Sequence, residues 1–152
     1  MRLAPLARAI RSAGPGQALA EVAVIVPLLV LLLIGLIEVG RYANFSILVS
    51  NAARAGVQYG AQNLVTAADN TAMQNAATAD AQNIAGLTAT ATHFCKCSDG
   101  SASTCLPTDC SSSHRLVYVK VDTTGTFASL LNFGGIVPSL TIAGHAVMRT
   151  AQ

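Results

Sequence analysis

A long apolar run near the start of the chain restricts most strongly what this sequence can fold into. The uncharged run 22–37 follows three further apolar residues, 18–20, and only Glu21 interrupts the twenty positions. A helix rises 1.5 Å per residue, so twenty positions cross about 30 Å, the thickness of the hydrocarbon core of a bilayer. A cleaved signal peptide has a shorter apolar stretch, of about 7–15 residues, and a small-x-small cleavage site. The run therefore predicts a retained transmembrane helix, which we place at residues 17–40.

The charges that flank this run predict its orientation. Arg2, Arg8 and Arg11 precede it without any acidic residue among them, whereas Arg41 on the far side is offset by Glu38. An excess of Lys and Arg marks the cytoplasmic side of a membrane helix. We therefore expect a single-pass protein with a cytoplasmic N-terminus and a C-terminal domain on the opposite side of the membrane.

Composition and motifs exclude several classes of function. Apolar residues make up 52% of the chain and charged residues 11%, the opposite of a disordered composition. The net charge of +2 is too small for a nucleic-acid footprint, so nucleic acid is not an expected partner. The sequence has no phosphate-binding loop, H-E-x-x-H or Gly-x-Ser-x-Gly motif. We interpret His93, His114 and His145 as surface residues and expect neither enzymatic activity nor a cofactor.

A glycine lies five positions before the interrupting glutamate, at the boundary between a short basic leader and the apolar run. The spacing Gly16-x4-Glu21 resembles the processing site of type IV prepilins, which a membrane-embedded aspartyl peptidase cuts directly after the glycine. The resemblance implies a leader peptide at residues 1–16 and a new N-terminus at Gln17. The new α-amine is positively charged near neutral pH, and we expect it to pair with Glu21 of a neighbouring subunit and so set the register between helices. The alternative is that Glu21 lies at the headgroup level without a partner.

Further motif positions occur in and after the apolar run: Pro27, Gly35, Glu38, Gly40, Arg41 and the segment 51–56, Asn-Ala-Ala-Arg-Ala-Gly. In combination, over about residues 14–62, they resemble the TadE-like pseudopilins of tight-adherence (Flp) pilus systems. In this resemblance Gly35, Glu38, Gly40 and Arg41 form a motif at the exit of the membrane helix.

The resemblance implies a membrane-anchored minor pilin-like subunit that supports assembly of a Flp pilus and is processed by a prepilin peptidase. Its partners would be that peptidase, other pilin or pseudopilin subunits, the inner-membrane pilus assembly platform and the lipid bilayer. It would lie in the bacterial inner membrane with its C-terminal domain in the periplasm, or outside the cell if the subunit enters a pilus. One alternative is an uncleaved bitopic scaffold protein of an envelope secretion machine. Another is a membrane-tethered zinc or redox protein.

The helical pattern continues beyond the membrane segment, through a region that we place at residues 41–86. Apolar residues recur three or four positions apart, and the glycines near the end of this stripe predict that the first helix ends between Gly60 and Val65. A second, short helix is predicted from Thr66 to Ile84, and Gly86 is its stop signal.

The C-terminal region, residues 87–152, shows the alternation that is typical of strands. Three strands are predicted, at residues 87–94, 115–123 and 140–150. Strands that follow helices favour an α+β fold, in which a small antiparallel sheet of about three strands packs on the long N-terminal helix in a pilin-like arrangement.

Four cysteines, Cys95, Cys97, Cys105 and Cys110, lie in one polar loop, 95–110. An even set in an oxidising compartment predicts two disulfides. A bridge between Cys95 and Cys97 would be strained, which leaves a nested and a crossed pairing. We favour the nested one, Cys95 with Cys110 and Cys97 with Cys105, because the loop joins two strands. Zinc is the rival interpretation, but the C-x-C spacing lacks the usual gap of a zinc site, so we expect no metal.

Overall fold

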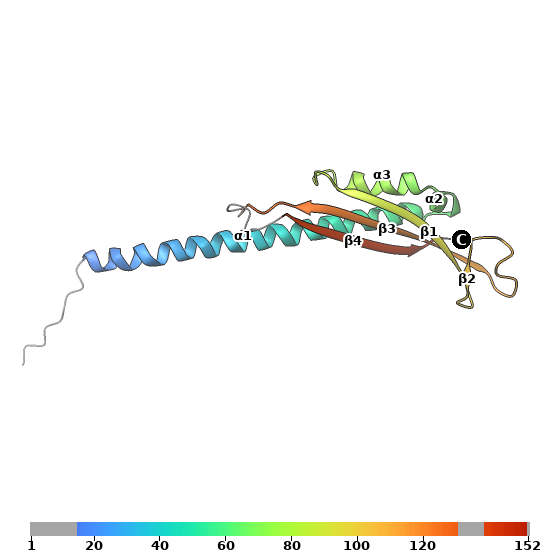
Figure 1. Cartoon of the computed structure of the whole chain (residues 1–152), viewed down its shortest axis with the longest axis horizontal. Helices are drawn as coiled ribbons and strands as arrows, with labels where there is room; N and C mark the ends of the chain where they lie inside the picture. Colours follow the sequence, from blue (N-terminus) through green and yellow to red (C-terminus); the bar gives the residue numbers. More distant parts are fainter. Residues whose placement is uncertain (1–14, 131–138, 152) are drawn as a thin grey trace, which may run out of the picture. The chain divides into compact units, whose positions relative to one another are not determined.

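A computed structural model of the chain describes residues 15–130 and 139–151. The chain divides into two compact units, residues 1–37 and residues 38–152. The helix α1, Pro15–Gly60, runs through the boundary as one element of 46 residues (Figure 1). It begins at a proline, which suits the first helical position because the amide that proline lacks has no partner there. Residues 1–14 of the predicted leader peptide, which include Arg2, Arg8 and Arg11, lie outside the described residues.

In the first unit, α1 carries an apolar surface that no other described segment covers. The large side chains of its apolar run are exposed, with Leu19, Leu31 and Leu36 among the most open. By length and composition, this helix could cross a membrane. Pro27 lies inside it, as membrane helices tolerate.

In the second unit, polar caps divide the predicted second helix into two. The helix α2, Leu64–Ala68, begins at Asn63, whose side-chain oxygen accepts hydrogen bonds from the amides of Val65 and Thr66. The next residue after α2, Asp69, has non-helical backbone angles and caps α3, Asn70–Asp80, by accepting from the Ala72 amide at 2.9 Å. The prediction of one helix over 66–84 was therefore wrong, because Asp69 ends one helix and starts another.

The strands form one antiparallel sheet of four, in the order β2-β1-β3-β4 (Figure 1). Their bounds are β1 Thr88–Cys97, β2 Ala102–Ser103, β3 Arg115–Phe127 and β4 Leu140–Arg149. The α+β arrangement is confirmed. The additional strand β2 is only two residues long, too short for an alternating pattern to reveal. Both β1 and β3 run further than predicted, and α1 ends at Gly60, the first residue of the expected range.

One face of this sheet is the core of the second unit. Alternate residues of β3, among them Val119, Val121 and Thr123, are fully buried against α1 and α3. The contact with α1 is closest at Val49, whose carbonyl oxygen accepts a hydrogen bond from the Thr123 hydroxyl at 2.7 Å. Gly144 of β4 lies against the same helical turn, because a Cβ built there would be 2.6 Å from that carbonyl oxygen.

Replacing Gly144 by alanine should lower the free energy of unfolding by about 1–3 kcal/mol, as overpacking of a tight core does. The atoms in the way are the Val49 backbone and the hydrogen-bonded Thr123 hydroxyl, neither of which can rotate away. Denaturant unfolding of the full chain in detergent micelles measures the change. The control is Gly40→Ala, since no atom lies within 4 Å of a Cβ at Gly40. An equal loss in both variants would contradict the close approach of α1 and β4.

Candidate functional site

The expected processing site lies in the first turn of α1. Gly16 is exposed and directly follows Pro15, and no atom lies within 4 Å of a Cβ built on it. The side chain of Gln17 lies outside what the structure describes. Glu21 is exposed and forms no hydrogen bond or ion pair with the described residues.

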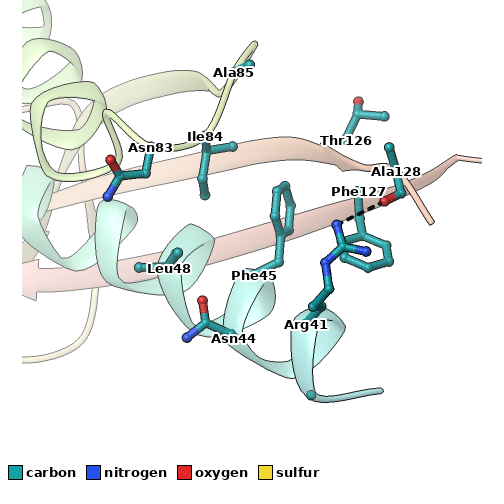
Figure 2. A pocket seen from close by; sticks show the side chains of 11 residues that line it. Arg41, Asn44, Phe45, Leu48, Asn83, Ile84, Ala85, Thr126, Phe127 and Ala128 are labelled. Carbon is teal, nitrogen blue, oxygen red and sulfur yellow. Dashed lines mark hydrogen bonds between the residues drawn. The ribbon is translucent and has the colours of Figure 1, made fainter. Parts of the chain in front are cut away.

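Phe127, the last residue of β3, is the centre of an aromatic contact with α1 (Figure 2). The Arg41 guanidinium lies over its ring at 5.4 Å from the centroid. The rings of Tyr42 and Phe45 meet it edge-on, at centroid distances of 5.7 and 5.6 Å. One aromatic residue therefore joins three positions on consecutive turns of α1 to the end of the strand.

A hollow of about 690 Å³ adjoins this contact (Figure 2). Its walls come from α1, from the loop between α3 and β1, and from the end of β3, and the lining residues are Gly40, Arg41, Asn44, Phe45, Leu48, Asn83, Ile84, Ala85, Thr126, Phe127 and Ala128. Its volume lies within the usual range for a small-molecule site, about 300–1,000 Å³.

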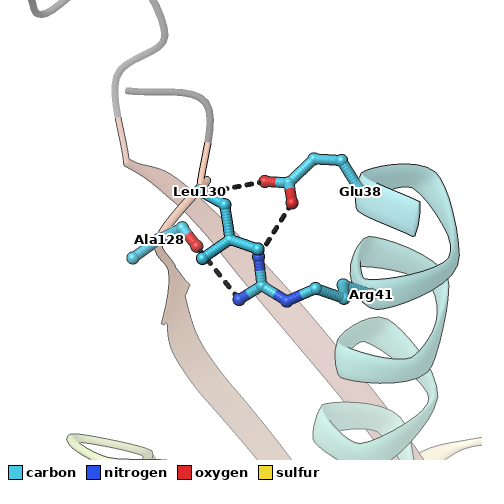
Figure 3. A network of polar contacts seen from close by, with 4 residues as sticks. All are labelled: Glu38, Arg41, Ala128 and Leu130. Carbon is cyan, nitrogen blue, oxygen red and sulfur yellow. Dashed lines mark hydrogen bonds and ion pairs between the residues drawn. The ribbon is translucent and has the colours of Figure 1, made fainter. Parts of the chain in front are cut away.

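Glu38 and Arg41 tie the chain after β3 to α1 (Figure 3). One Glu38 carboxylate oxygen accepts from Arg41 Nη1 at 2.8 Å, and the other accepts from the Leu130 amide at 2.9 Å. The Ser129 side chain also bonds this carboxylate. A second Arg41 nitrogen, Nη2, donates to the Ala128 carbonyl at 3.5 Å. The residues predicted as the helix-exit motif thus include a pair that fixes the end of β3.

Gly35 and Gly40, the two glycines of the predicted helix-exit motif, make no close contact of the kind that Glu38 and Arg41 make. Neither Gly35 nor Gly40 has an atom within 4 Å of a Cβ built on it. Gly40 lines the hollow, whereas Gly35 belongs to the first unit. Phe127 was missed by sequence reasoning, because the predicted strand stopped at residue 123. The only sequence signal for Phe127 was the alternation of buried and exposed residues, which continues beyond residue 123 to the end of β3.

The segment 51–56 divides into buried and exposed positions. Ala52 and Ala53 are fully buried, and a Cβ on Gly56 would lie 2.9 Å from the Met73 carbonyl oxygen of α3. Asn51 and Arg54 are exposed and form no hydrogen bond or ion pair within residues 15–130 and 139–151. Small residues therefore allow α1 to approach α3 and the sheet, while the two polar residues face outward.

The cysteines pair in the crossed manner, not in the nested one that we favoured. Cys95 bonds Cys105, and Cys97 bonds Cys110, with Cα–Cα distances of 5.1 and 5.5 Å. A tight turn after Cys97 returns the chain beside β1, so that Ser103 pairs with Cys95 and Cys105 follows close by. The second part of the loop must then return to Arg115, which pairs with Cys97, and this path brings Cys110 to Cys97.

A single carboxylate organises the loop between the two bridges. One Asp109 oxygen, Oδ2, accepts from the Thr104 amide at 2.6 Å, the Thr104 hydroxyl at 2.8 Å and the Ser103 hydroxyl at 3.0 Å. The Leu106 amide donates to the same oxygen at 3.3 Å. These bonds, chiefly that from the Thr104 side chain, hold the pKa of Asp109 below its usual range. Asp109 was not predicted, although Thr-Asp in a polar loop is a common turn signal.

None of the three histidines contacts Asp109: His93 lies on β1, His145 lies on β4, and His114 directly precedes β3. His145 Nδ1 is 2.6 Å from Asp122 Oδ1 on the neighbouring strand, and Lys120 also contacts that carboxylate at 2.9 Å. These bonds, with that of His145 the stronger, lower the pKa of Asp122. His93 and His114 are exposed. Within the described part of the chain, no group of three or more His, Cys, Asp or Glu residues could hold a metal ion.

Removing the Glu38 carboxylate should release the segment after β3. In Glu38→Ala, hydrogen exchange at the Leu130 amide should accelerate by about tenfold, because a charge-assisted hydrogen bond is lost. Glu38→Gln keeps an acceptor oxygen for that amide and should have a smaller effect. The readout is site-resolved hydrogen exchange, with Asn51→Ala on the same helix as the control. An unchanged Leu130 rate in Glu38→Ala would show that the contact does not order this segment.

The order of the cysteine loop should depend on pH through Asp109. A carboxyl with a lowered folded-state pKa stabilises above its unfolded pKa, about 3.9, and loses that contribution as pH falls through the folded value. The protection factors of the Thr104 and Leu106 amides should therefore be constant from pH 7 to 5 and fall below about pH 4.

Asp109→Asn should reduce these protection factors at pH 7 by about threefold to tenfold, since Asp109 is only half-buried and its charge is partly screened by solvent. Asp80→Asn is the matched control, because the Asp80 side chain has no hydrogen bond or ion pair within the described chain. Equal protection in Asp109→Asn and the wild type would contradict the role of this carboxylate.

Comparison with known proteins finds a similarity over part of the chain. Residues 16–58 match the family model for TadE-like protein. No curated protein and no solved structure matches the chain. The matched residues include Gly16, Glu21, the Glu38–Arg41 pair and the segment 51–56. Over residues 16–58, less than half of its length, the chain is similar to the TadE-like protein family.

Proposed function

We propose that this protein is a membrane-anchored minor pilin-like subunit that supports assembly of a tight-adherence (Flp) pilus. The observation that carries the proposal is the family match over residues 16–58, which extends from the expected processing site through the apolar run to the part of α1 that packs on the sheet. Its partners would be a prepilin peptidase, other pilin or pseudopilin subunits, the inner-membrane assembly platform and the lipid bilayer.

The uncovered apolar helix supports membrane anchoring. Each large apolar side chain between Leu19 and Ile37 that remains in water costs about 1.5–3 kcal/mol relative to burial. No described segment covers these side chains, and twenty helical positions match the hydrocarbon thickness of a bilayer. A bilayer would remove this cost. The helix would then span the bacterial inner membrane once.

The surroundings of Gly16 support proteolytic maturation. A peptidase must approach the backbone closely, and glycine has no Cβ to obstruct that approach. The open space around Gly16 and its place in the first turn of α1 are consistent with access once the turn frays. Cleavage after Gly16 would leave the positively charged α-amine of Gln17 at the start of the mature helix.

Glu21 would then act in assembly and not in chemistry. A carboxylate in a bilayer is costly without a partner, and Glu21 has none within the described chain. Pairing with the α-amine of a neighbouring subunit would neutralise both groups and fix the axial register of the two helices.

The disulfides support a periplasmic location for the second unit, or an extracellular one if the subunit enters the filament. Structural disulfides persist in oxidising compartments and are rare in the cytoplasm. The pairs Cys95–Cys105 and Cys97–Cys110 leave no free cysteine. The three arginines of the leader would keep the N-terminus in the cytoplasm.

Co-expression of the full chain with its prepilin peptidase tests the proposal. Cleavage between Gly16 and Gln17 should remove about 1.6 kDa, measured by intact mass. Gly16→Leu should block the cut, whereas Gly14→Leu, a matched glycine two residues earlier, should leave it in place. Glu21→Gln should be cut and inserted but should fail to support pilus assembly.

Three outcomes would contradict the proposal or a part of it. An intact chain in the presence of active peptidase would favour the uncleaved scaffold protein of a secretion machine. Four alkylatable thiols in protein from intact membranes would contradict both the bridges and the periplasmic location. Normal pilus assembly with Glu21→Gln would show that this carboxylate only reaches the headgroups and does not set the register.

A further inference from the structure

We propose that the free edge of β4 is a docking site for an extended, acidic segment of another protein, which adds a further strand to the sheet. The site lies wholly in the second unit and does not depend on the proposed function. Strand addition is a common mode of peptide recognition, because backbone hydrogen bonds supply affinity and the alternating side chains supply specificity.

Half of the backbone groups of β4 point away from the sheet. β4 is the last strand in the order β2-β1-β3-β4, and Figure 1 shows it at the margin of the sheet. Directly after β4, the Thr150 amide donates to the Val117 carbonyl at 2.9 Å, so the even-numbered residues bond to β3. The odd-numbered residues within 141–149 therefore direct both their N–H and their C=O outward. The Ala151 amide agrees with this direction, because it donates to the Ala61 carbonyl, just after α1, and not to β3.

No described segment occupies this edge. Within 141–149, no outward N–H or C=O group has a hydrogen-bond partner among the described residues. Natural sheets protect such edges by short strands, bulges, lysine or proline. β4 has ten residues in uninterrupted register with β3 and contains neither lysine nor proline. Donors and acceptors that repeat at the strand spacing are matched by another polypeptide backbone, so an extended peptide is the occupant that fits.

The outer face of the sheet, opposite α1 and α3, carries an excess of positive charge. Lys96, Lys120 and Arg149 lie on this face, and Asp122 is the one acidic residue there among the described strands. Its carboxylate is already bound by His145 at 2.6 Å and by Lys120 at 2.9 Å. The second unit as a whole has six basic and six acidic residues, so the excess is local to this face. Carboxylates on the added strand would complement it.

The same residues disfavour a second copy of the chain as the occupant. When two antiparallel β4 strands pair all of their outward groups, His145 faces its own copy and Arg149 faces Thr141. This pairing brings basic groups together and supplies no carboxylate, because β4 contains none. A strand with carboxylates opposite His145 and Arg149 gains two favourable cross-strand pairs instead.

The flank of α1 above this edge is also open. Leu48 packs with Ile84 on the side of α1 that faces the loop before β1, and Ser50 lies about 200° further round the helix, on the β4 side. A hollow of about 210 Å³ lies on this flank and is lined by Ser46, Ile47, Ser50, Asn51 and Arg54. The two small serines leave room for side chains that an added strand directs toward α1, and the exposed Arg54 adds a further positive charge.

Binding of a synthetic strand to the full chain in detergent micelles tests the proposal. The probe is the capped, fluorescently labelled peptide Glu-Thr-Val-Thr-Glu-Thr-Val-Thr-Thr, whose glutamates lie opposite Arg149 and His145 when it pairs antiparallel to β4. At saturation, it should slow hydrogen exchange at the Ala143, His145 and Val147 amides at least about tenfold and leave the even-numbered amides of β4 unchanged. A peptide with lysine in place of both glutamates should bind about tenfold more weakly, measured by fluorescence anisotropy.

Methylation of the probe's backbone separates strand addition from simple charge attraction. Methyl groups on the amide nitrogens of its third, fifth and seventh residues, which would face β4, should abolish binding. Methyl groups on the second, fourth and sixth amide nitrogens, which would face away, should change the affinity by less than about threefold.

A charge reversal on β4 tests the side-chain pairing. Arg149→Glu should weaken binding of the glutamate peptide by about threefold to tenfold and strengthen binding of the lysine peptide, a change of sign that misfolding would not produce. Lys96→Glu is the matched control, because it changes the charge of the outer face equally but lies on β1, which β3 separates from β4. Both variants must form both disulfides and keep the wild-type circular dichroism.

Several results would overturn the proposal. They are no binding of the glutamate peptide at millimolar concentration, equal binding of the two peptides, full binding of the peptide methylated on its β4-facing amides, or an equal effect of Lys96→Glu. Protection of the Ala143, His145 and Val147 amides without peptide, if it rises with protein concentration, would assign the edge to a second copy and would also overturn it.

Discussion

The contact between the Val49 turn of α1 and the strands β3 and β4 positions the helix on the sheet in the second unit. The Thr123 hydroxyl donates to the Val49 carbonyl at 2.7 Å, and glycines at 125 and 144 leave space for the helix to come this close. Because the interior of a protein is densely packed, this contact restricts the position of α1 along the sheet. Phe45, Arg41 and Glu38 then follow at fixed helical intervals toward the end of β3.

The two ends of β3 are held by different chemistry that suits different surroundings. At Phe127, non-covalent contacts from Glu38 and Arg41 join the strand to α1, a few residues from the apolar run. At Arg115, two disulfides and the Asp109 hydrogen bonds shape the loop, and the Arg115 guanidinium donates to the Cys105 carbonyl. The loop has almost no apolar residues to bury, so covalent bonds replace a core there.

The order of helices and strands was predictable because each has a clear period, whereas the site depended on contacts that no local pattern specifies. Val117, Val119 and Val121 alternate with polar residues, and the start of β3 at Arg115 was predicted correctly. The C-x-C spacing puts Cys95 and Cys97 on the same face of β1 but does not state which partner each one meets. That depends on the turn near Gly100, with a φ of +90°, and on Cys105, with a φ of +72°. Similarly, the sequence predicted that Glu38 and Arg41 offset each other. It could not predict the hydrogen bond between Glu38 and the Leu130 amide, because these two residues are 92 positions apart.

The positions of α1 that the family model matches fall into two groups: some pack inside this chain, and one has no partner in it. Ala52, Ala53 and Gly56 are explained by packing, since a larger residue at any of them would separate α1 from α3 or the sheet. Glu21, which has no partner within the described residues, is not explained by the fold of one chain. On the proposed function, its carboxylate would lie near one face of a bilayer, where an unneutralised charge is costly. A lone subunit would therefore carry an energetic cost that a bundle of subunits removes, and the same charge that weakens the isolated anchor would favour its assembly.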